Sequence, residues 1–455
     1  MAFDLIDRYK KRSSPPGQEG IQGWSIQWFR QTQQRYSPER HKGPLPARPI
    51  ISTPSLILSF SLPLFPPFPL SSFLPLSLLL LTLAGCGSLK LNTPTAGAND
   101  WPTEGASARR QYAPLTEIAP PLELVWDYNA SAAFGPGSPL IIGNAVIIAT
   151  RQGEIQIVEF KTGKRRGVKG FGDAVEGTPA FKDGILFIPG AWGGRALYAY
   201  GLNRGDLLWS VKGDPVETGV LISSGNVVVV DAAPRIAAYA PRTGTLKWER
   251  RLDPGAAVLA SPVAIGENAF AVANEDGLVT ALDGATGKVL WTADAGAPVQ
   301  STPSSRDSLL FLPTTRGQMV ALDTHDGHRV WAYDIHSQRV YFSSPAASDS
   351  GLVFGASDGK VRALDPRTGT LKWAFDGGEA FSAAPLITRN VVYVGGLDGK
   401  LYALKRSDGT KLWDYELDGR VKSALASRGD YIVVASEPKN VYLFKASDPD
   451  YAENK

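Results

Sequence analysis

The sequence predicts an all-β protein, an eight-bladed β-propeller whose blades are four-stranded antiparallel sheets. Three observations predict this fold. A glycine-tryptophan turn recurs about every 40 residues, eight short apolar runs recur with it, and the two ends of the repeat array complement each other. Four strands in each repeat of about 40–45 residues are typical of a propeller blade.

The glycine-tryptophan turn is the most regular feature of the chain. Its tryptophans lie 39, 43, 40, 42 and 40 residues apart, each four positions after a glycine, and they are Trp209, Trp248, Trp291, Trp331, Trp373 and Trp413. A seventh copy has Gly163, but Gly167 stands at the tryptophan position. A large rigid side chain at one position of each blade predicts packing between blades, with the indole N–H on a backbone acceptor. We therefore assign these tryptophans to the architecture rather than to substrate stacking.

Short apolar runs supply the strands of each repeat. There are eight, from NAVIIAT at 144–150 to DYIVVAS at 430–436, and their β-branched residues favour strands. A small residue and a proline precede most of them, as at Ser138-Pro139. Each unit therefore predicts two strands, a turn, a third strand, the glycine turn and a final strand.

The ends of the array predict ring closure. Trp126, in LELVWDY, has no repeat ahead of it, and the last unit stops after NVYLFKASD without a glycine-tryptophan strand. If the strand around Trp126 completes the last blade, the ring closes without an exposed edge at the junction. The propeller is predicted to span residues 120–448, with residues 449–455 as a C-terminal tail.

The residues before the propeller divide into three segments. Residues 1–48 are an irregular extension that a start codon assigned too early would explain. Residues 49–85 are free of charge, follow a basic flank and end in a leucine-rich run, which predicts a signal peptide. A membrane-spanning helix is the alternative, but Pro63, Pro66, Pro67, Pro69 and Pro75 interrupt the stretch. Residues 86–119 are rich in Gly, Pro, Ala, Ser and Thr and are predicted to be a lipidated tether.

Charge excludes one class of function. The chain has a net charge of +3, but residues 1–85 hold nine basic and four acidic residues, so 38 basic and 40 acidic residues remain beyond them. No basic run of the kind that binds nucleic acid is present in this main part. A short cluster around one turn, which we interpret as a solvated turn, comprises Lys161, Lys164, Arg165, Arg166 and Lys169.

The single cysteine, Cys86, excludes an intramolecular disulfide and a multi-cysteine metal site. Leu83, Ala84 and Gly85 directly before it resemble the lipobox of bacterial lipoproteins. The resemblance implies a diacylglyceryl group on the Cys86 thiol and cleavage that leaves Cys86 first. The residue directly after Cys86 is Gly87 and not an aspartate, and in this resemblance that implies sorting to the outer membrane.

The phrase ALDGATGKVLW, which ends at Trp291, resembles the repeat of the quinoprotein-like propellers over roughly residues 120–448. Combined with the lipobox, it makes the chain similar to the BamB family of outer-membrane protein assembly lipoproteins. That resemblance implies a non-enzymatic protein held by lipid at the periplasmic face of the outer membrane. It also implies a BamA-like barrel subunit as partner, together with unfolded outer-membrane proteins, and no cofactor besides the lipid.

Two other classes stay open. One is a propeller that acts as a sensor or ligand-binding lipoprotein. The other is a quinone-dependent dehydrogenase, a class that carries a calcium site, a catalytic aspartate and usually a disulfide between adjacent cysteines. The propeller segment here has no cysteine.

No residue pattern predicts a catalytic or metal site. Asp283, Asp323 and Asp365 precede three of the turn glycines by four residues, and we expect them to accept hydrogen bonds from turn backbone. His325 and His328 flank one turn at a spacing that can ligate zinc, but no further ligand is near in sequence.

The irregular loops 189–195, 212–219 and 336–342 are the predicted partner-binding positions, because exposed loops usually carry binding. They contain aromatic and arginine side chains of the kind that anchor interfaces, namely Trp192, Arg195, Arg339, Tyr341 and Phe342. The alternative for Tyr341 and Phe342 is that they begin a buried strand.

Overall fold

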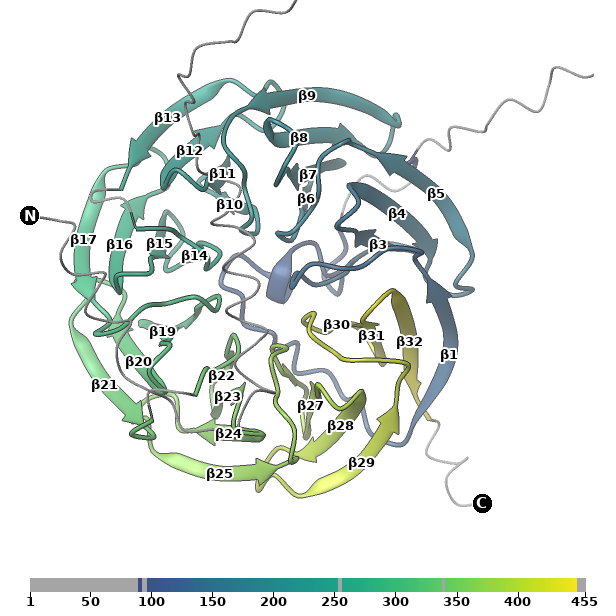
Figure 1. The fold of residues 1–455 in the computed structure, drawn as a ribbon, viewed down its shortest axis with the longest axis vertical. Coiled ribbons are helices and arrows are strands. Elements are labelled where there is room, and N and C mark those ends of the chain that lie inside the picture. The colour runs from purple at the N-terminus through teal and green to yellow at the C-terminus, as the bar shows by residue number, and fades with distance from the viewer. Residues whose placement is uncertain (1–88, 92–95, 253–255, 338–339, 448–455) are drawn as a thin grey trace, which may run out of the picture. The chain divides into compact units, whose positions relative to one another are not determined.

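The described part of the chain forms a ring of eight blades around a central axis (Figure 1). The computed structural model describes residues 89–91, 96–252, 256–337 and 340–447. Each blade is a four-stranded antiparallel sheet, and these residues add one short 3-10 helix, η2 (Glu104–Ala106). Within the same ranges, no helix has the length and apolarity needed to cross a bilayer. The predicted fold class is confirmed.

The strands follow the chain around the ring, and the blades are numbered in that order. Blade 1 contains β2 (Leu140–Ile142), β3 (Ala145–Ala149), β4 (Glu154–Glu159) and β5 (Arg165–Gly170). Blade 2 contains β6 (Ala180–Lys182), β7 (Ile185–Pro189), β8 (Arg195–Gly201) and β9 (Asp206–Lys212). Blade 3 contains β10 (Leu221–Ser223), β11 (Asn226–Val230), β12 (Arg235–Tyr239) and β13 (Leu246–Arg251). Blade 4 contains β14 (Val263–Ala264), β15 (Ala269–Ala273), β16 (Leu278–Asp283) and β17 (Val289–Asp294).

The second half of the ring repeats this plan. Blade 5 contains β18 (Ser304–Arg306), β19 (Leu309–Pro313), β20 (Gln318–Asp323) and β21 (Arg329–Asp334). Blade 6 contains β22 (Ala346–Ser348), β23 (Gly351–Gly355), β24 (Lys360–Leu364) and β25 (Leu371–Asp376). Blade 7 contains β26 (Leu386–Ile387), β27 (Val391–Gly395), β28 (Lys400–Lys405) and β29 (Lys411–Glu416). Blade 8 contains β30 (Ala426–Arg428), β31 (Tyr431–Ser436), β32 (Asn440–Ala446) and, from the start of the propeller, β1 (Leu122–Asn129).

The second strand of each blade carries the predicted apolar run. β7, β23 and β27 are buried at every position, because the neighbouring blades cover both of their faces. Strands covered on both sides have near-continuous apolar sequences rather than alternating ones. The fourth strands differ, since β25 buries only Trp373 and exposes most of its other side chains.

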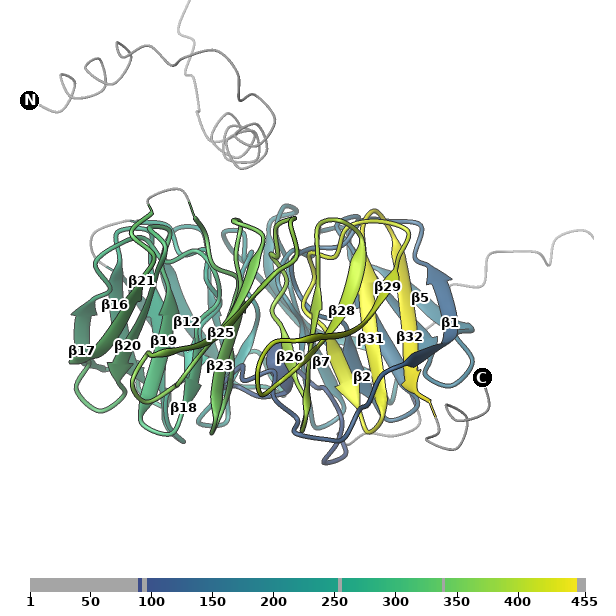
Figure 2. The same cartoon turned by 90° about the horizontal axis from the view of Figure 1, so that it is seen from below.

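The ends of the strands define two faces of the disc, which Figure 2 shows edge-on. One face carries the loops between blades and the turns between second and third strands, and we call it the loop face. The opposite face carries the turns between first and second strands and the glycine turns between third and fourth strands, and we call it the turn face. The antiparallel order of every blade fixes this division.

The tryptophans join each blade to the next. Six indole Nε1–H groups donate to the carbonyl three residues before the next blade's turn glycine: Trp126 to Phe160 (2.8 Å), Trp209 to Pro241 (2.9 Å), Trp248 to Gly284 (3.1 Å), Trp291 to Thr324 (3.0 Å), Trp331 to Pro366 (3.1 Å) and Trp373 to Arg406 (2.9 Å). The ring of Trp291 lies on Gly327, where a Cβ atom would come within 2.5 Å of it. Trp413 packs against Phe444 in blade 8 instead. The packing role predicted for these residues is confirmed.

The first propeller strand and the last three form one blade. β1 pairs with β32 in antiparallel register from Leu122 opposite Ala446 to Asn129 opposite Asn440. The N-terminal strand therefore lies at the outside of blade 8, and Trp126 on it docks onto blade 1.

Two glycine substitutions test the docking contact. Gly327 and Gly378 both have positive φ, 78° and 84°, but a Cβ at Gly378 would meet no atom within 4 Å. Gly378→Ala therefore reports backbone strain alone, about 1–2 kcal/mol. We expect Gly327→Ala to lower the free energy of unfolding by about 1–3 kcal/mol more, because the methyl group displaces Trp291. Denaturant titration of both variants measures the difference, and equal losses would contradict the docking role.

Candidate functional site

The N-terminal segment crosses the ring axis toward the turn face. We call residues 96–121 the strap (Figures 1 and 2). Its backbone bonds the innermost strands of six blades: Trp101 with Ile141, Pro102 with Phe181, Ala108 with Ala264, Arg109 with Ser305, Gln111 with Ala347 and Tyr112 with Ile387. The described part of the predicted tether is therefore a structured element of the ring, because it satisfies backbone groups that would otherwise border the axis.

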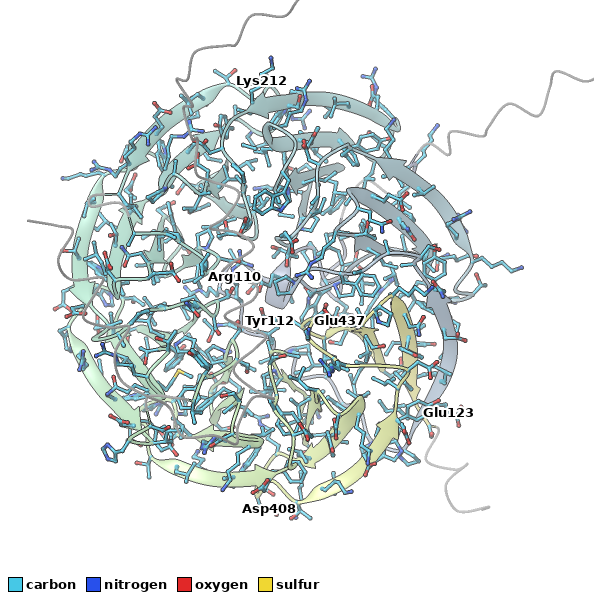
Figure 3. All side chains as sticks on the ribbon, viewed as in Figure 1. Arg110, Tyr112, Glu123, Lys212, Asp408 and Glu437 are labelled. Atoms are coloured by element: carbon cyan, nitrogen blue, oxygen red, sulfur yellow. The ribbon has the colours of Figure 1, made fainter. Side chains whose placement is uncertain are left out.

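A buried ionic network fixes the middle of the strap. Glu104, Arg110 and Tyr112 are almost fully buried near the axis, where Figure 3 labels the last two. Arg110 Nη1 lies 2.6 Å from one carboxylate oxygen of Glu104, and the Tyr112 hydroxyl donates to the other at 2.8 Å. Arg110 Nε also donates to the carbonyl of Pro262 at 2.8 Å, which ties the network to blade 4. Burial raises the pKa of Tyr112 well above its ordinary value, so its hydroxyl remains a donor.

A cavity lies on the loop-face side of the strap, with Glu104 and Tyr112 in its floor. Its volume is about 170 Å³, and small polar residues from loops of most blades form its wall. Sites for drug-sized ligands are usually larger, at about 300–1,000 Å³. Glu217 is one of its charged residues. The pKa of the Glu217 carboxyl is raised, mainly by burial and to a smaller extent by the negative charge of the nearby Glu176.

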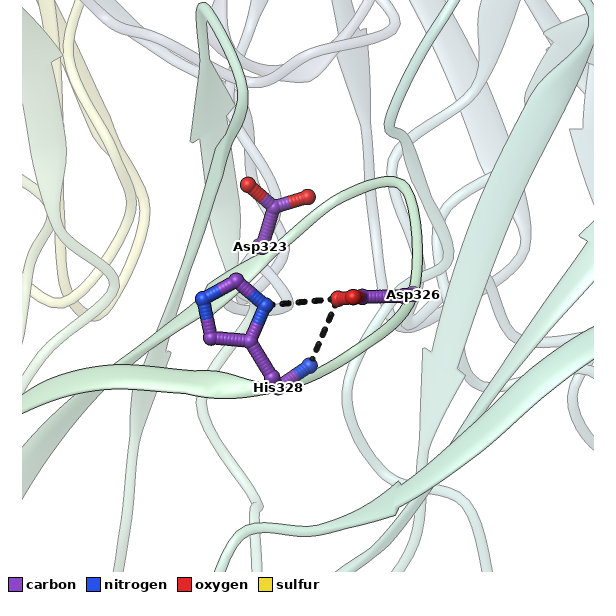
Figure 4. A group of neighbouring side chains, drawn as sticks. All are labelled: Asp323, Asp326 and His328. Carbon is purple, nitrogen blue, oxygen red and sulfur yellow. Dashed lines mark hydrogen bonds and ion pairs between the residues drawn. The ribbon is translucent and has the colours of Figure 1, made fainter.

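Among the described residues, one group of acidic and histidine side chains could hold a metal ion, and it lies at the turn after β20. Asp323, Asp326 and His328 have ligand atoms within 4.8 Å of one another, as Figure 4 shows. Asp326 accepts from the backbone N–H of His328 and lies 2.7 Å from its Nδ1, and this hydrogen bond raises the pKa of His328. Asp323 accepts from the backbone of His325 in the same way. Asp283 and Asp365 cap their own turns too, which confirms the turn role predicted for the repeated aspartate.

The predicted interface residues do not form one patch. Trp192 lies in the loop between β7 and β8 of blade 2 and Arg195 begins β8, and both are exposed, Trp192 at 38%. Tyr341 is 46% exposed beside blade 6, while Arg339 lies outside the described residues. Phe342 is only 2% exposed, and its ring packs 4.6 Å from that of Phe354. The assignment of Phe342 to the interface is therefore wrong, because a bridge with Ala356 draws it into the sheet of blade 6.

A groove on the loop face of blades 4–6 contains Tyr341. It has a volume of about 410 Å³, and its other charged or polar lining includes Glu275, Asp276 and Gln300. Gln300 also borders the axial cavity and donates to Glu275 at 2.8 Å. The groove and the cavity are therefore neighbours across one side chain.

The loop face as a whole is acidic. Among its described residues that are not fully buried, ten are acidic and five are basic: Glu176, Asp214, Glu217, Glu275, Asp276, Asp358, Glu379, Asp398, Asp418 and Glu437 against Arg151, Arg316, Arg420, Lys422 and Lys439. Charge complementarity steers association, so this face suits a partner with a basic surface.

Comparison with known proteins identifies the family. The family described as outer membrane protein assembly factor BamB matches residues 151–263, 235–375 and 357–449, which is more than half of the chain. The chain belongs to this family. A BamB-family relative from Burkholderia pseudomallei (strain K96243), named outer membrane protein assembly factor BamB, is 28% identical over 243 residues. That alignment covers 49% of this chain and 63% of the relative.

Solved structures share the fold of this BamB-family chain. The crystal structure of BamB from Moraxella catarrhalis superposes with a TM-score of 0.60 at 19% identity, covering 71% of this chain and 99% of that one. Quinohemoprotein alcohol dehydrogenase from Comamonas testosteroni superposes with a TM-score of 0.66 at 16% identity, covering 79% and 83%. A BamB protein and an alcohol dehydrogenase therefore share this ring, so the fold alone does not give the function.

Substitutions in the strap test the ionic network. Arg110→Met leaves the Glu104 carboxylate buried without its cationic partner, and we expect the free energy of unfolding to fall by about 3–5 kcal/mol. Glu104→Gln combined with Arg110→Met should recover part of this loss, because no unpaired buried charge remains. Arg204→Met, which breaks the exposed pair with Asp206, should change stability little. Equal denaturation midpoints for Arg110→Met and Arg204→Met would contradict the role of the network.

Proposed function

We propose that the protein is a non-catalytic scaffold subunit of outer-membrane β-barrel assembly, held by lipid at the periplasmic face of the outer membrane. Its membership of the BamB family, over residues 151–449, is the observation that carries this proposal. The ring would present rigid loops to a BamA-like barrel subunit, since loops on a rigid scaffold are the usual site of binding.

The filled axis supports a non-catalytic role. An organic cofactor on the axis would have to fit above the strap, in a cavity of about 170 Å³. The residues that form its floor are already engaged, because Glu104 binds both Arg110 and Tyr112. A propeller whose own chain fills its axis supports binding at the faces and the rim rather than chemistry at the centre.

The loop-face groove is the surface we assign to the barrel subunit. Tyr341 is exposed beside it and is of the residue type that anchors interfaces. Asp276 adds an exposed carboxylate to the groove, and the acidic loop face around it would attract basic groups of the partner.

The outer strands offer a second kind of contact, to unfolded barrel proteins. The fourth strand of each blade pairs on one side only, so its other edge can accept an extended segment. Exposed aliphatic side chains lie on seven of these strands: Leu124, Val125, Leu207, Leu208, Leu246, Leu290, Val330, Leu371 and Leu412. An alternating apolar strand of an unfolded barrel protein has the matching chemistry.

Recovery of the native complex tests the scaffold role. Affinity purification from membranes should recover a BamA-like subunit, and Asp276→Lys should lower that recovery about tenfold because it reverses a charge at the groove. Glu267→Lys is the matched control, since Glu267 is exposed at a turn of the same blade on the opposite face. If the unaltered protein recovers no assembly subunit at normal stoichiometry, the proposed function is wrong.

Lipid attachment has its own test, because Cys86 lies outside the described residues. Incorporation of a labelled fatty acid should be lost in Cys86→Ser, since the cysteine is the only thiol of the chain. Unchanged incorporation of the labelled fatty acid in Cys86→Ser would refute the anchor, whatever the outcome with the barrel subunit.

A further inference from the structure

The junction between blades 1 and 2 lacks a docking tryptophan. Gly167 stands at that position of β5, so β5 brings no indole to the turn of blade 2. The equivalent carbonyl at this junction belongs to Leu202, three residues before the turn glycine Gly205. It accepts a hydrogen bond from the backbone N–H of Leu91 at 2.8 Å. The chain's own N-terminal segment therefore takes the hydrogen bond that an indole makes at six other junctions.

Leucine side chains fill the space of the missing ring. Leu89 is fully buried and Leu91 is 8% exposed, and both pack in one cluster with Tyr198, Tyr200 and Leu202. The point at which the chain enters the fold is therefore fixed between blades 1 and 2. Cys86 precedes Leu89 by three residues, so a lipid on Cys86 lies within about 10 Å of this junction along the chain.

The rim on both sides of this junction is basic. The outer turns and strands of blades 1–3 (160–170, 202–212 and 241–251) hold eleven basic and two acidic residues. The matching segments of blades 4–7 hold six basic and seven acidic residues, and β1 in blade 8 adds Glu123 and Asp127. Figure 3 labels Lys212 on the basic part of the rim, and Glu123 and Asp408 on the part formed by blades 7 and 8.

We call the eleven basic residues the basic arc, and all of them are exposed: Lys161, Lys164, Arg165, Arg166, Lys169, Arg204, Lys212, Arg242, Lys247, Arg250 and Arg251. Blade 1 contributes most. In blades 2–8, at least one of the two residues directly before the tryptophan position is aliphatic. In blade 1 both of these residues are arginines, Arg165 and Arg166. Arg166 pairs with Glu159, whereas the described residues offer Lys161, Lys164 and Lys169 no ion-pair partner.

We propose that the basic arc is the membrane-facing surface of the protein and binds the anionic headgroups of a phospholipid bilayer. This rests on the proposed lipid anchor, which would bring the rim near the bilayer. Attraction between basic side chains and an anionic surface falls off within a Debye length, about 8 Å at physiological salt. The chain between Cys86 and Leu89 can span at most about 10 Å, which is comparable to the Debye length. A basic patch beside an acyl chain supplies the second signal that stable membrane attachment needs.

Vesicle flotation of the full chain tests the proposal. Vesicles of phosphatidylcholine alone are compared with vesicles that also contain anionic phosphatidylglycerol, and the ratio of bound protein is the readout. We expect Lys161→Gln, Lys164→Gln and Lys169→Gln together to lower that ratio about tenfold. Added salt should lower the ratio for the unaltered protein as well. The three lysines make no ion pair among the described residues, so the variant should fold, and an unchanged denaturation midpoint checks this.

The matched control removes the same charge elsewhere on the rim. Lys288→Gln, Lys372→Gln and Lys411→Gln together lie in blades 4, 6 and 7 and should leave the ratio near that of the unaltered protein. An equal loss in both triple variants, or a ratio of one for the unaltered protein, overturns the proposal; the second result would favour an acidic protein as the ligand of the arc. Cys86→Ser should lower binding to both vesicle types alike, so failure of the anchor is distinguishable from failure of the arc.

Discussion

A carbonyl oxygen three residues before a turn glycine is the point at which six of the eight blades bind the tryptophan of the blade before them. The glycine provides the positive φ of the turn and leaves room for an indole ring to lie on the backbone. The indole then buries its apolar surface and donates its single N–H in the same contact. The ring has eight junctions, and six of them have such a contact. At the junction between blades 1 and 2 the carbonyl accepts a different donor.

The junction between blades 1 and 2 is also the point at which the chain enters the ring. Leu91 supplies the donor, and from there the chain crosses the axis as the strap before it becomes β1. The strap bonds the innermost strands on its way and carries the Glu104–Arg110 pair to the centre. At the junction without a tryptophan, Leu91 therefore fixes the point at which the chain enters the ring, and the strap that follows fills the ring axis.

The repeated parts of this structure could be predicted from the sequence, and the unrepeated parts could not. Eight copies of one strand pattern predicted the blades, and the recurrence of Trp291 and its relatives predicted their packing role. The strap occurs once, and its Gly- and Ala-rich composition is also that of a linker. Trp101, Arg110 and Tyr112 were the only signal within it, and no spacing rule connects them to the innermost strands. The prediction that Phe342 lies at the interface was wrong for a related reason, because the chain joins the sheet of blade 6 earlier than the loop pattern indicated.

Charge separates the surfaces that the two proposals use. The acidic loop face and the basic arc lie on different sides of the disc, since one follows the inter-blade loops and the other follows three outer strands. A disc that meets the bilayer along blades 1–3 stands on its rim, so neither face is covered by lipid. Of the blades that form the Tyr341 groove, blade 4 lies next to blade 3 and blade 6 lies opposite blade 2 (Figure 1), so the groove extends from the side of the ring toward the part farthest from the bilayer. For the proposed scaffold function, this separation leaves the loop-face groove available to the barrel partner, because a surface that binds headgroups cannot also bind that partner.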